Sequence, residues 1–185
     1  MKKEIINEIV MPEGVEVNLD NNTIIVKGPK GEIKRTLLSK VVSMEKTDNK
    51  LVLKSIDFSR NGKKMVNTFT AHIRNMVVGV TEGYIYKLKV CSGHFPMTLK
   101  IDPDKILVNN FLGEKIPRKA RIIEGANVKQ DGDVLTVEGI SKETVAQTAA
   151  NIETSTRITN RDRRRFQDGI YITEKAGVPI WAKNY

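Results

Sequence analysis

The sequence predicts an α+β protein made of two tandem copies of a small domain, each an antiparallel β-sheet packed with one α-helix. Residues 17–28 can be laid over residues 128–139 without a gap, and both stretches have the pattern strand, polar turn, strand, glycine. A helical pattern follows further along each half, and a chain of 185 residues is long enough for two cores. The match is short, so an internal duplication and two unrelated hairpins both remain open.

The first half is expected to contain the hairpin, further strands and one helix. Residues 20–22 are turn formers flanked by β-branched and apolar residues, which is typical of a hairpin. Strand-like runs follow at residues 32–38, 41–45 and 51–55. A helix then ends near Gly79, with its apolar stripe formed by Phe69, Ile73, Met76 and Val77.

The second half begins with residues 83–91, which alternate as a strand does and have no linker character, so the joint between the halves is expected to be short. Further strands are expected at residues 97–101, 106–109 and 120–123. Ser141 can cap a helix that begins at Lys142 and carries Glu143 in its first turn. Its inner face would be Val145, Ala149 and Ile152. The expected domains are residues 1–84 and 85–176, with a C-terminal extension over 177–185.

The charge of the chain indicates a polyanionic partner. It has 31 Lys and Arg against 22 Asp and Glu, a formal net charge of +9. Five of its ten arginines lie between Arg157 and Arg165, and residues 166–171 add aromatic residues and a glycine. Guanidinium groups bind phosphate oxygens through paired hydrogen bonds and rings stack on bases, so we interpret this tail as an RNA-docking segment. The alternative is a solvated helix face whose charge Asp162 and Asp168 partly neutralise.

Several protein classes do not fit the sequence. No apolar run approaches the roughly 20 residues that span a bilayer. Acidic residues interrupt the start of the chain, where a secretory signal would be apolar, so we expect a soluble, intracellular protein. The single cysteine, Cys91, cannot form an internal disulfide and is interpreted as a packed apolar residue rather than a reactive thiol.

No catalytic or metal-binding constellation is recognisable. The two histidines and one cysteine lack the spacing of a zinc site. Residues 28–31, Gly-Pro-Lys-Gly, lie between two strand patterns, so they are interpreted as a hairpin tip and not as a phosphate-binding loop or the loop of a KH domain. His94 is interpreted as a loop histidine with a structural hydrogen bond rather than a catalytic base. We therefore expect no enzyme, no metal, no cofactor and no small-molecule substrate.

Four motifs, with order and spacing preserved, resemble a known family: residues 25–32, 93–96, 127–139 and 166–171. This is the large-subunit ribosomal protein family called L six in bacteria and archaea and L nine in eukaryotic nomenclature. The last motif, Phe-Gln-Asp-Gly-Ile-Tyr, is more similar to the archaeal and eukaryotic branch. The resemblance covers residues 3 to 176, and residues 177–185 match no motif of the family. It implies two tandem α+β domains and a position on ribosomal RNA near the sarcin-ricin loop, in the factor-binding region.

The resemblance also implies which residues bind RNA. They are Lys27, Lys30, His94, Arg157, Arg161, Arg163, Arg164, Arg165, Phe166, Gly169 and Tyr171. The arginines would pair with phosphates, and the two aromatic residues would stack on bases or pack the segment onto the domain. Gly169 would allow a positive φ or a close backbone approach.

The expected function is a structural constituent of the large ribosomal subunit, with large-subunit ribosomal RNA and neighbouring ribosomal proteins as partners and no membrane. The expected location is the cytoplasmic ribosome, with assembly in the nucleolus if the source is eukaryotic. The alternative is a non-ribosomal RNA-binding protein or ribosome-assembly factor of similar fold.

Overall fold

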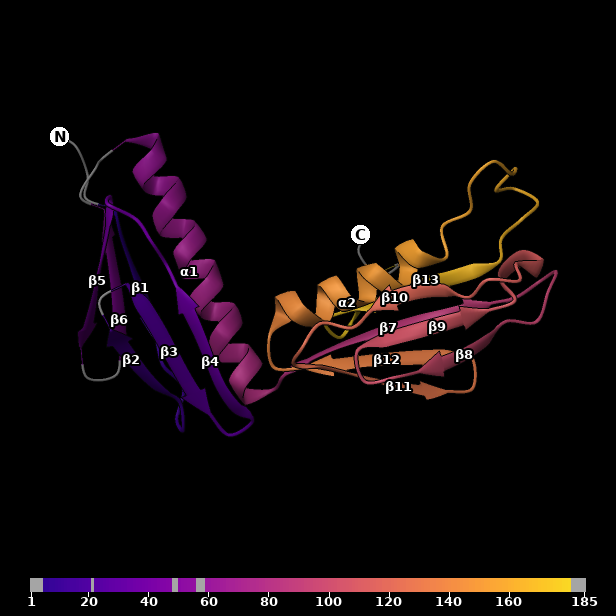
Figure 1. Ribbon diagram of the computed structural model, residues 1–185. Coiled ribbons are helices and arrows are strands. Elements are labelled where there is room, and N and C mark those ends of the chain that lie inside the picture. Colours follow the sequence, from indigo (N-terminus) through magenta and orange to yellow (C-terminus); the bar gives the residue numbers. More distant parts are fainter. Residues whose placement is uncertain (1–4, 21, 48–49, 56–58, 181–185) are drawn as a thin grey trace. The chain divides into compact units, whose positions relative to one another are not determined.

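The computed structural model describes residues 5–20, 22–47, 50–55 and 59–180 (Figure 1). The chain divides into two compact units, Met1–Gly83 and Tyr84–Tyr185, each with its own sheets and helix. The boundary lies one residue before the one expected from the sequence.

The first unit contains two three-stranded antiparallel sheets and one long helix. The strands are β1 (Ile6–Val10), β2 (Glu16–Asp20), β3 (Thr23–Gly28), β4 (Gly31–Thr36), β5 (Val42–Thr47) and β6 (Lys50–Ser55). One sheet has the order β1-β6-β5 and the other has the order β2-β3-β4. Helix α1 (Arg60–Thr81) contacts strands of both sheets, including β1, β3 and β6.

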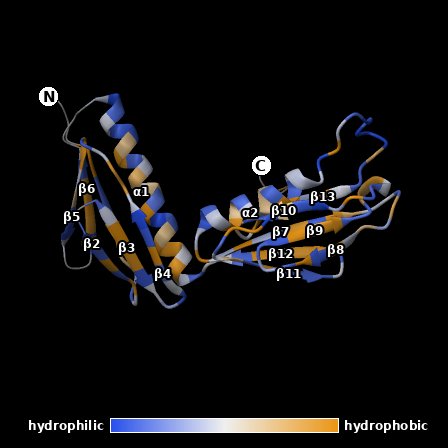
Figure 2. Cartoon of the chain, viewed as in Figure 1, coloured by the Kyte–Doolittle hydropathy of each residue, from blue (hydrophilic) through white to orange (hydrophobic). Residues whose placement is uncertain are grey.

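The core of the first unit lies between its sheets and α1. Alternate residues of the strands are buried, among them Ile24, Val26 and Leu53, because successive side chains of a strand point to opposite faces. On α1, Val66 and Ile73 are fully buried on one face, whereas most polar residues of the helix lie outside (Figure 2). The Ser59 side chain accepts a hydrogen bond from the Gly62 amide and so caps the helix.

The second unit has the same elements and two more strands. They are β7 (Tyr84–Cys91), β8 (Thr98–Ile101), β9 (Lys105–Asn109), the 3-10 turn η1 (Phe111–Gly113), β10 (Arg118–Arg121), β11 (Ala126–Asp131), β12 (Val134–Gly139), α2 (Lys142–Ser155), β13 (Gly169–Lys175) and β14 (Val178–Pro179). One sheet has the order β11-β12-β7-β13-β14 and the other has the order β10-β9-β8. Helix α2 packs on strands of both sheets.

A single apolar core holds the second unit together. Leu88 of β7, Phe111 of η1 and Ile170 of β13 are fully buried in one cluster with the inner face of α2. That face consists of the predicted Val145, Ala149 and Ile152 together with the buried Thr148. The Ser141 side chain accepts a hydrogen bond from the Thr144 amide, so the predicted capped helix is confirmed.

The two units repeat one topology. In each, a first strand is followed by a three-stranded meander, a hairpin and a helix, and the first strand pairs with the second strand of the hairpin. The predicted α+β duplication is therefore confirmed, but the stretches that indicated it are not equivalent. Residues 17–28 form β2 and β3, whose counterparts are β8 and β9, whereas residues 128–139 belong to β11 and β12. A strand-turn-strand pattern is local and does not encode the place of a hairpin in the sheet.

The strands that the sequence did not predict are β1, β13 and β14. Residues 169–175 were expected to belong to a tail, but β13 pairs with β7 inside the larger sheet. β14 pairs with β13, so Val178 and Pro179 extend this sheet and do not form a separate segment. The other residues assigned to the C-terminal extension, 181–185, lie outside the described part of the chain.

Candidate nucleic-acid interface

The clustered arginines lie on a loop and not on a tail or a helix. This loop, residues 157–168, which we call the arginine loop, leaves the end of α2 and returns to the start of β13 (Figure 1). Residues 161–165 are all exposed, and the loop is hydrophilic along most of its length (Figure 2). Because α2 and β13 are both packed in the core, the two ends of the loop that carries these charges are held in place.

Arg118 of β10 fastens the start of the arginine loop. Its Nη1 donates to the carbonyl oxygens of Ser155 and Arg157, at 3.1 and 3.0 Å. Its Nε and Nη2 form a bidentate pair with the Glu114 carboxylate at 2.8 and 2.6 Å. The guanidinium carbon also lies 4.2 Å from the centre of the Phe111 ring. A cation that binds the Ser155 carbonyl is favourable because the last carbonyl oxygens of a helix have no partner within it.

Asp168 fastens the end of the arginine loop. Its carboxylate is 1% exposed, and its Oδ1 accepts the amides of Gly93 and His94 at 2.5 and 2.8 Å. Its Oδ2 lies 2.5 Å from Nδ1 of His94, which donates to it. This contact joins the loop between β7 and β8 to the arginine loop, so three donors satisfy one buried carboxylate.

Burial by itself would raise the pKa of Asp168, since desolvation disfavours the charged form. The hydrogen bonds from the His94 amide, the His94 ring and the Gly93 amide outweigh this effect and hold the pKa below its ordinary value. The carboxylate is therefore ionised at neutral pH and acts as an acceptor only.

The Phe166 ring belongs to the same cluster. It is half-buried and stacks on the imidazole of His94, with 4.8 Å between the ring centres and 30° between the planes. The guanidinium carbon of Arg161 lies 5.0 Å from the centre of the Phe166 ring, within the range of a cation–π contact. A chain of contacts thus runs from buried Asp168 through His94 and Phe166 to the exposed charge of Arg161.

The arginines of the loop differ in how their charge is balanced. Arg164 forms a bidentate ion pair with Asp162, at 2.9 Å from Nη2 to Oδ2. This contact lowers the pKa of the Asp162 carboxyl. Asp162 thus neutralises part of the cluster, whereas Asp168 binds the 93–94 loop instead. Within the described residues, no carboxylate pairs with the remaining guanidinium groups of the loop, those of Arg157, Arg161, Arg163 and Arg165.

Tyr171 lies beside the loop in a cleft of about 330 Å³ that Arg157 and Arg163 also line. Its hydroxyl donates to the carbonyl oxygen of Asp168 at 3.4 Å. Burial is the main cause that raises the pKa of this hydroxyl. Gly169 has φ +152°, and a Cβ there would be 3.2 Å from the Tyr171 ring. Only glycine combines this backbone conformation with such a close approach.

A family model described as "Ribosomal protein L6" matches residues 11–83 and 95–169, one match in each unit. The chain belongs to the ribosomal protein L6 family. Three archaeal relatives, each named "Large ribosomal subunit protein uL6", agree with this result. The protein of Methanobrevibacter smithii is 46% identical over 91% of this chain and 94% of its own length. The protein of Methanosarcina mazei is 43% identical over 95% of this chain and 100% of its own length. That of Aeropyrum pernix is 44% identical over 92% of this chain and 94% of its own length.

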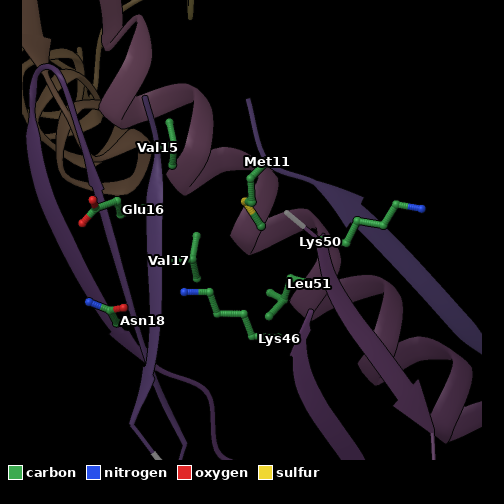
Figure 3. A pocket seen from close by; sticks show the side chains of 8 residues that line it. All are labelled: Met11, Val15, Glu16, Val17, Asn18, Lys46, Lys50 and Leu51. Carbon is green, nitrogen blue, oxygen red and sulfur yellow. The ribbon is translucent and has the colours of Figure 1, made fainter. Parts of the chain in front are cut away.

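This L6 chain is accordingly a ribosomal protein of the large subunit and not an enzyme, which confirms the family and the non-enzymatic function inferred from the sequence. The described residues contain no group of three or more metal-ligating side chains, and no helix among them is both long and apolar enough to cross a bilayer. A cleft of about 230 Å³ in the first unit is lined by Met11, Glu16, Lys46 and Lys50, among others (Figure 3). The pair of acids that hydrolytic catalysis commonly uses is not among its lining residues.

The two predicted lysines of the L6 chain lie on the β3–β4 hairpin of the first unit. Lys27 forms an exposed ion pair with Glu32 at 3.3 Å. The Lys30 side chain donates to the carbonyl oxygen of Glu82, and its amide donates to that of Val80 at 3.0 Å. Residues 28–31 thus form the predicted hairpin tip, and the Lys30 side chain contacts the end of α1. A role of either lysine in RNA binding stays a prediction.

Sequence reasoning missed the roles of Arg118 and Asp168. Arg118 lies far from the arginine cluster in the sequence and has no local pattern that marks it. Asp168 lies within a family motif, but its neighbours in the sequence indicated only a neutraliser of arginines. The Gly-His pair at residues 93–94 and the Asp-Gly pair at 168–169 both belong to motifs of the resemblance, which was the available signal that the two segments act together.

Proposed function

We propose that this L6 chain is a structural constituent of the large ribosomal subunit that binds ribosomal RNA through the arginine loop. One observation carries the proposal. The guanidinium groups of Arg157, Arg161, Arg163 and Arg165 form no ion pair with a carboxylate in the described part of the chain, and their loop is fastened at both ends. A polyanion that binds there gains ionic contacts without first breaking ion pairs within the protein, and little loop entropy is lost.

The contacts support two different roles for the side chains of the loop. The exposed guanidinium groups are available to phosphate oxygens, which fix register and orientation but do not read sequence. Phe166 is already stacked on His94, which favours packing over base stacking and gives both residues the role of holding Arg161. Specificity then comes from the shape of the folded RNA that matches the fixed loop.

The resemblance to the family further suggests a position near the sarcin-ricin loop, in the factor-binding region, with other ribosomal proteins as neighbours. A cross-linking map from the arginine loop on purified large subunits tests this position. Cross-links confined to another region of the ribosomal RNA would contradict it.

Replacing Arg163, Arg164 and Arg165 together by alanine tests the RNA contact. Since these residues are exposed, we expect the second unit to stay folded and the incorporation of the tagged chain into large subunits to fall. A matched control removes three exposed lysines outside the loop, Lys46, Lys100 and Lys129. Equal incorporation of the arginine variant and the parent would overturn the assignment of the loop.

The alternative is a ribosome-assembly factor or another RNA-binding protein that cycles on and off its RNA. Sedimentation of a lysate at high salt separates the two functions. A structural constituent remains with the large subunit after the salt wash, whereas a loosely held factor is found at the top of the gradient.

A further inference from the structure

The duplicated topology leaves one strand edge covered in the second unit and open in the first. β7 pairs with β12 on one side and with β13 on the other. Its counterpart β1 pairs with β6, and no strand in the described part of the chain pairs with its second edge. Helix α1 leads directly into β7, so the segment that could follow α1 and cover β1 is used to start the second unit.

The second unit shows what fits such an edge. β13 runs antiparallel to β7 and contacts α2. Ile170 and Ile172 of β13 are buried, at 0% and 9% exposure. The amides of the same two residues donate to Thr156 Oγ1 and Glu153 Oε1 at the end of α2, at 2.9 and 3.0 Å. An extended strand with alternate apolar side chains thus fills the space between the edge strand and the helix.

The corresponding space in the first unit is open. A cleft of about 580 Å³ lies between β1 and α1, and its lining includes Ile6 and Asn7 of β1 and Thr70, Ala71 and Arg74 of α1. Asn7 donates to the side chains of Asn67 and Thr70 at 3.0 and 3.1 Å. Thr70 is 4% exposed, and its hydroxyl also donates to the carbonyl oxygen of Val66 at 2.8 Å. The described residues at this cleft include no strand in the place that β13 takes beside β7.

The backbone of β1 is also ready to pair. The Ser55 amide donates to the carbonyl oxygen of Ile5 at 3.0 Å, so residues 5, 7 and 9 direct their polar groups to β6. The backbone amides and carbonyls of Ile6, Glu8 and Val10 then point to the open edge of β1. The side chains of Ile6 and Val10 are 43% and 63% exposed. β1 contains neither proline nor lysine, which commonly protect edge strands from pairing.

We propose that an extended segment of another ribosomal protein binds in this cleft and adds a strand antiparallel to β1, in the place that β13 takes beside β7. Backbone hydrogen bonds to Ile6, Glu8 and Val10 would supply affinity. Side chains that point toward α1 must be small or apolar where they meet Ala71. An acidic residue on the segment would pair with Arg74, whose guanidinium has no acidic partner within the described residues. The inference rests on the proposed function, because the partner is a component of the same subunit.

Photo-cross-linking in assembled subunits tests the inference. A full-length tagged chain carrying benzoylphenylalanine at Val10 is incorporated into large subunits in cells, and the salt-washed subunits are irradiated. We expect a cross-link to one defined peptide of another protein. The same amino acid at Lys46, on the opposite edge strand β5, serves as a matched position and is expected not to yield that peptide.

A variant of α1 separates strand addition from mere proximity. Ala71→Trp is expected to lower the cross-link yield from Val10 by about tenfold, because the indole fills the cleft and overpacking costs binding energy. Thr68→Trp places the same ring on an exposed position outside the cleft and is expected to leave the yield unchanged. The Ala71→Trp chain folds because residue 71 is exposed, and subunits that contain it report directly on the cleft.

The outcomes distinguish this inference from the proposed function. A tagged chain absent from large subunits would overturn both. A chain present in large subunits that cross-links from Val10 to ribosomal RNA, to a second copy of itself or to nothing would overturn the strand addition alone. Equal cross-link yields from Ala71→Trp and Thr68→Trp would also overturn the strand addition alone.

Discussion

At the scale of single residues, Asp168 is the side chain on which the geometry of the candidate interface depends most. It is nearly fully buried and accepts from two amides and one imidazole on another loop. Replacing it by alanine is expected to destabilise the second unit by about 1–3 kcal/mol, since buried donors lose a charged acceptor. Urea denaturation measures this loss. Asp162→Ala, at an exposed position on the same loop, is the control and is expected to change the midpoint little.

The pH dependence of stability depends on the same residue. Because its hydrogen bonds lower the pKa of Asp168 in the folded protein, the unfolded chain takes up the proton first. The stabilisation is fully present above the unfolded pKa of about 3.9 and is lost as the pH falls through the lower folded pKa. The difference in urea midpoint between the parent and Asp168→Ala is thus expected to be constant near neutral pH and to shrink below about pH 4. A constant difference down to pH 3 would contradict this role.

At the scale of the elements, Arg118 links β10, η1 and the end of α2 to the start of the arginine loop. Arg118→Met removes these hydrogen bonds but keeps most of the apolar stem. If about 1.4 kcal/mol of loop docking is lost, the open form rises roughly tenfold, and trypsin cleavage after residues 161–165 accelerates by a similar factor. Arg121→Met, at an exposed position of the same strand, is the control. Equal cleavage rates for the two variants would show that Arg118 does not hold the loop.

The helix cores give a second prediction at this scale. Phe69 of α1 and Ile152 of α2 are 5% and 0% exposed, each in the core of its own unit. Alanine at either position is expected to cost about 2–5 kcal/mol. Hydrogen exchange measured by mass spectrometry should show the faster exchange in the unit that carries the change. Faster exchange in the other unit would mean that the two cores do not unfold separately.

Local patterns predicted the elements whose signals are local. The cap at Ser141 and the stripe of Val145, Ala149 and Ile152 are sufficient to predict α2, because an amphipathic helix needs no distant partner to be recognised. β13 was missed because Gly169 and Tyr171 lie in a family motif that suggested a tail, and its strand conformation depends on pairing with β7. The arginines of the site were predictable from their density. The role of Arg118 was not, since the loop carbonyls that it binds, those of Ser155 and Arg157, are 37 and 39 residues away along the chain.

At the scale of the whole molecule, the second unit differs from the first in the segment that comes after its helix. After α1 the chain continues directly into β7 of the second unit, whereas α2 is followed by the arginine loop and β13. The loop therefore gains a fixed base on both sides, at α2 through Arg118 and at the sheet through Asp168. The duplicated fold thus comprises two modules that differ in structure, one with a strand edge that no described strand covers and one with a fastened cationic loop.

The net charge of +9 attracts RNA in general, so the contribution of particular arginines is best measured by the salt dependence of binding. Arg163→Ala together with Arg165→Ala removes two cations that have no acidic partner in the described part of the chain. The slope of log affinity against log salt is expected to become less steep by about 1.4 to 1.8, which corresponds to two lost phosphate contacts.

The control for this measurement is the pair Arg164→Ala and Asp162→Ala, which removes a whole ion pair and leaves the net charge unchanged. Because the guanidinium of Arg164 is already neutralised by Asp162, its loss together with the carboxylate is expected to leave the slope unchanged. The measurement is a titration of purified large-subunit ribosomal RNA with the full-length chain at several potassium chloride concentrations. If both double variants changed the slope equally, Arg164 would leave Asp162 on binding and contact phosphate as its neighbours do. If neither changed it, the cationic surface that meets the RNA would lie outside the arginine loop.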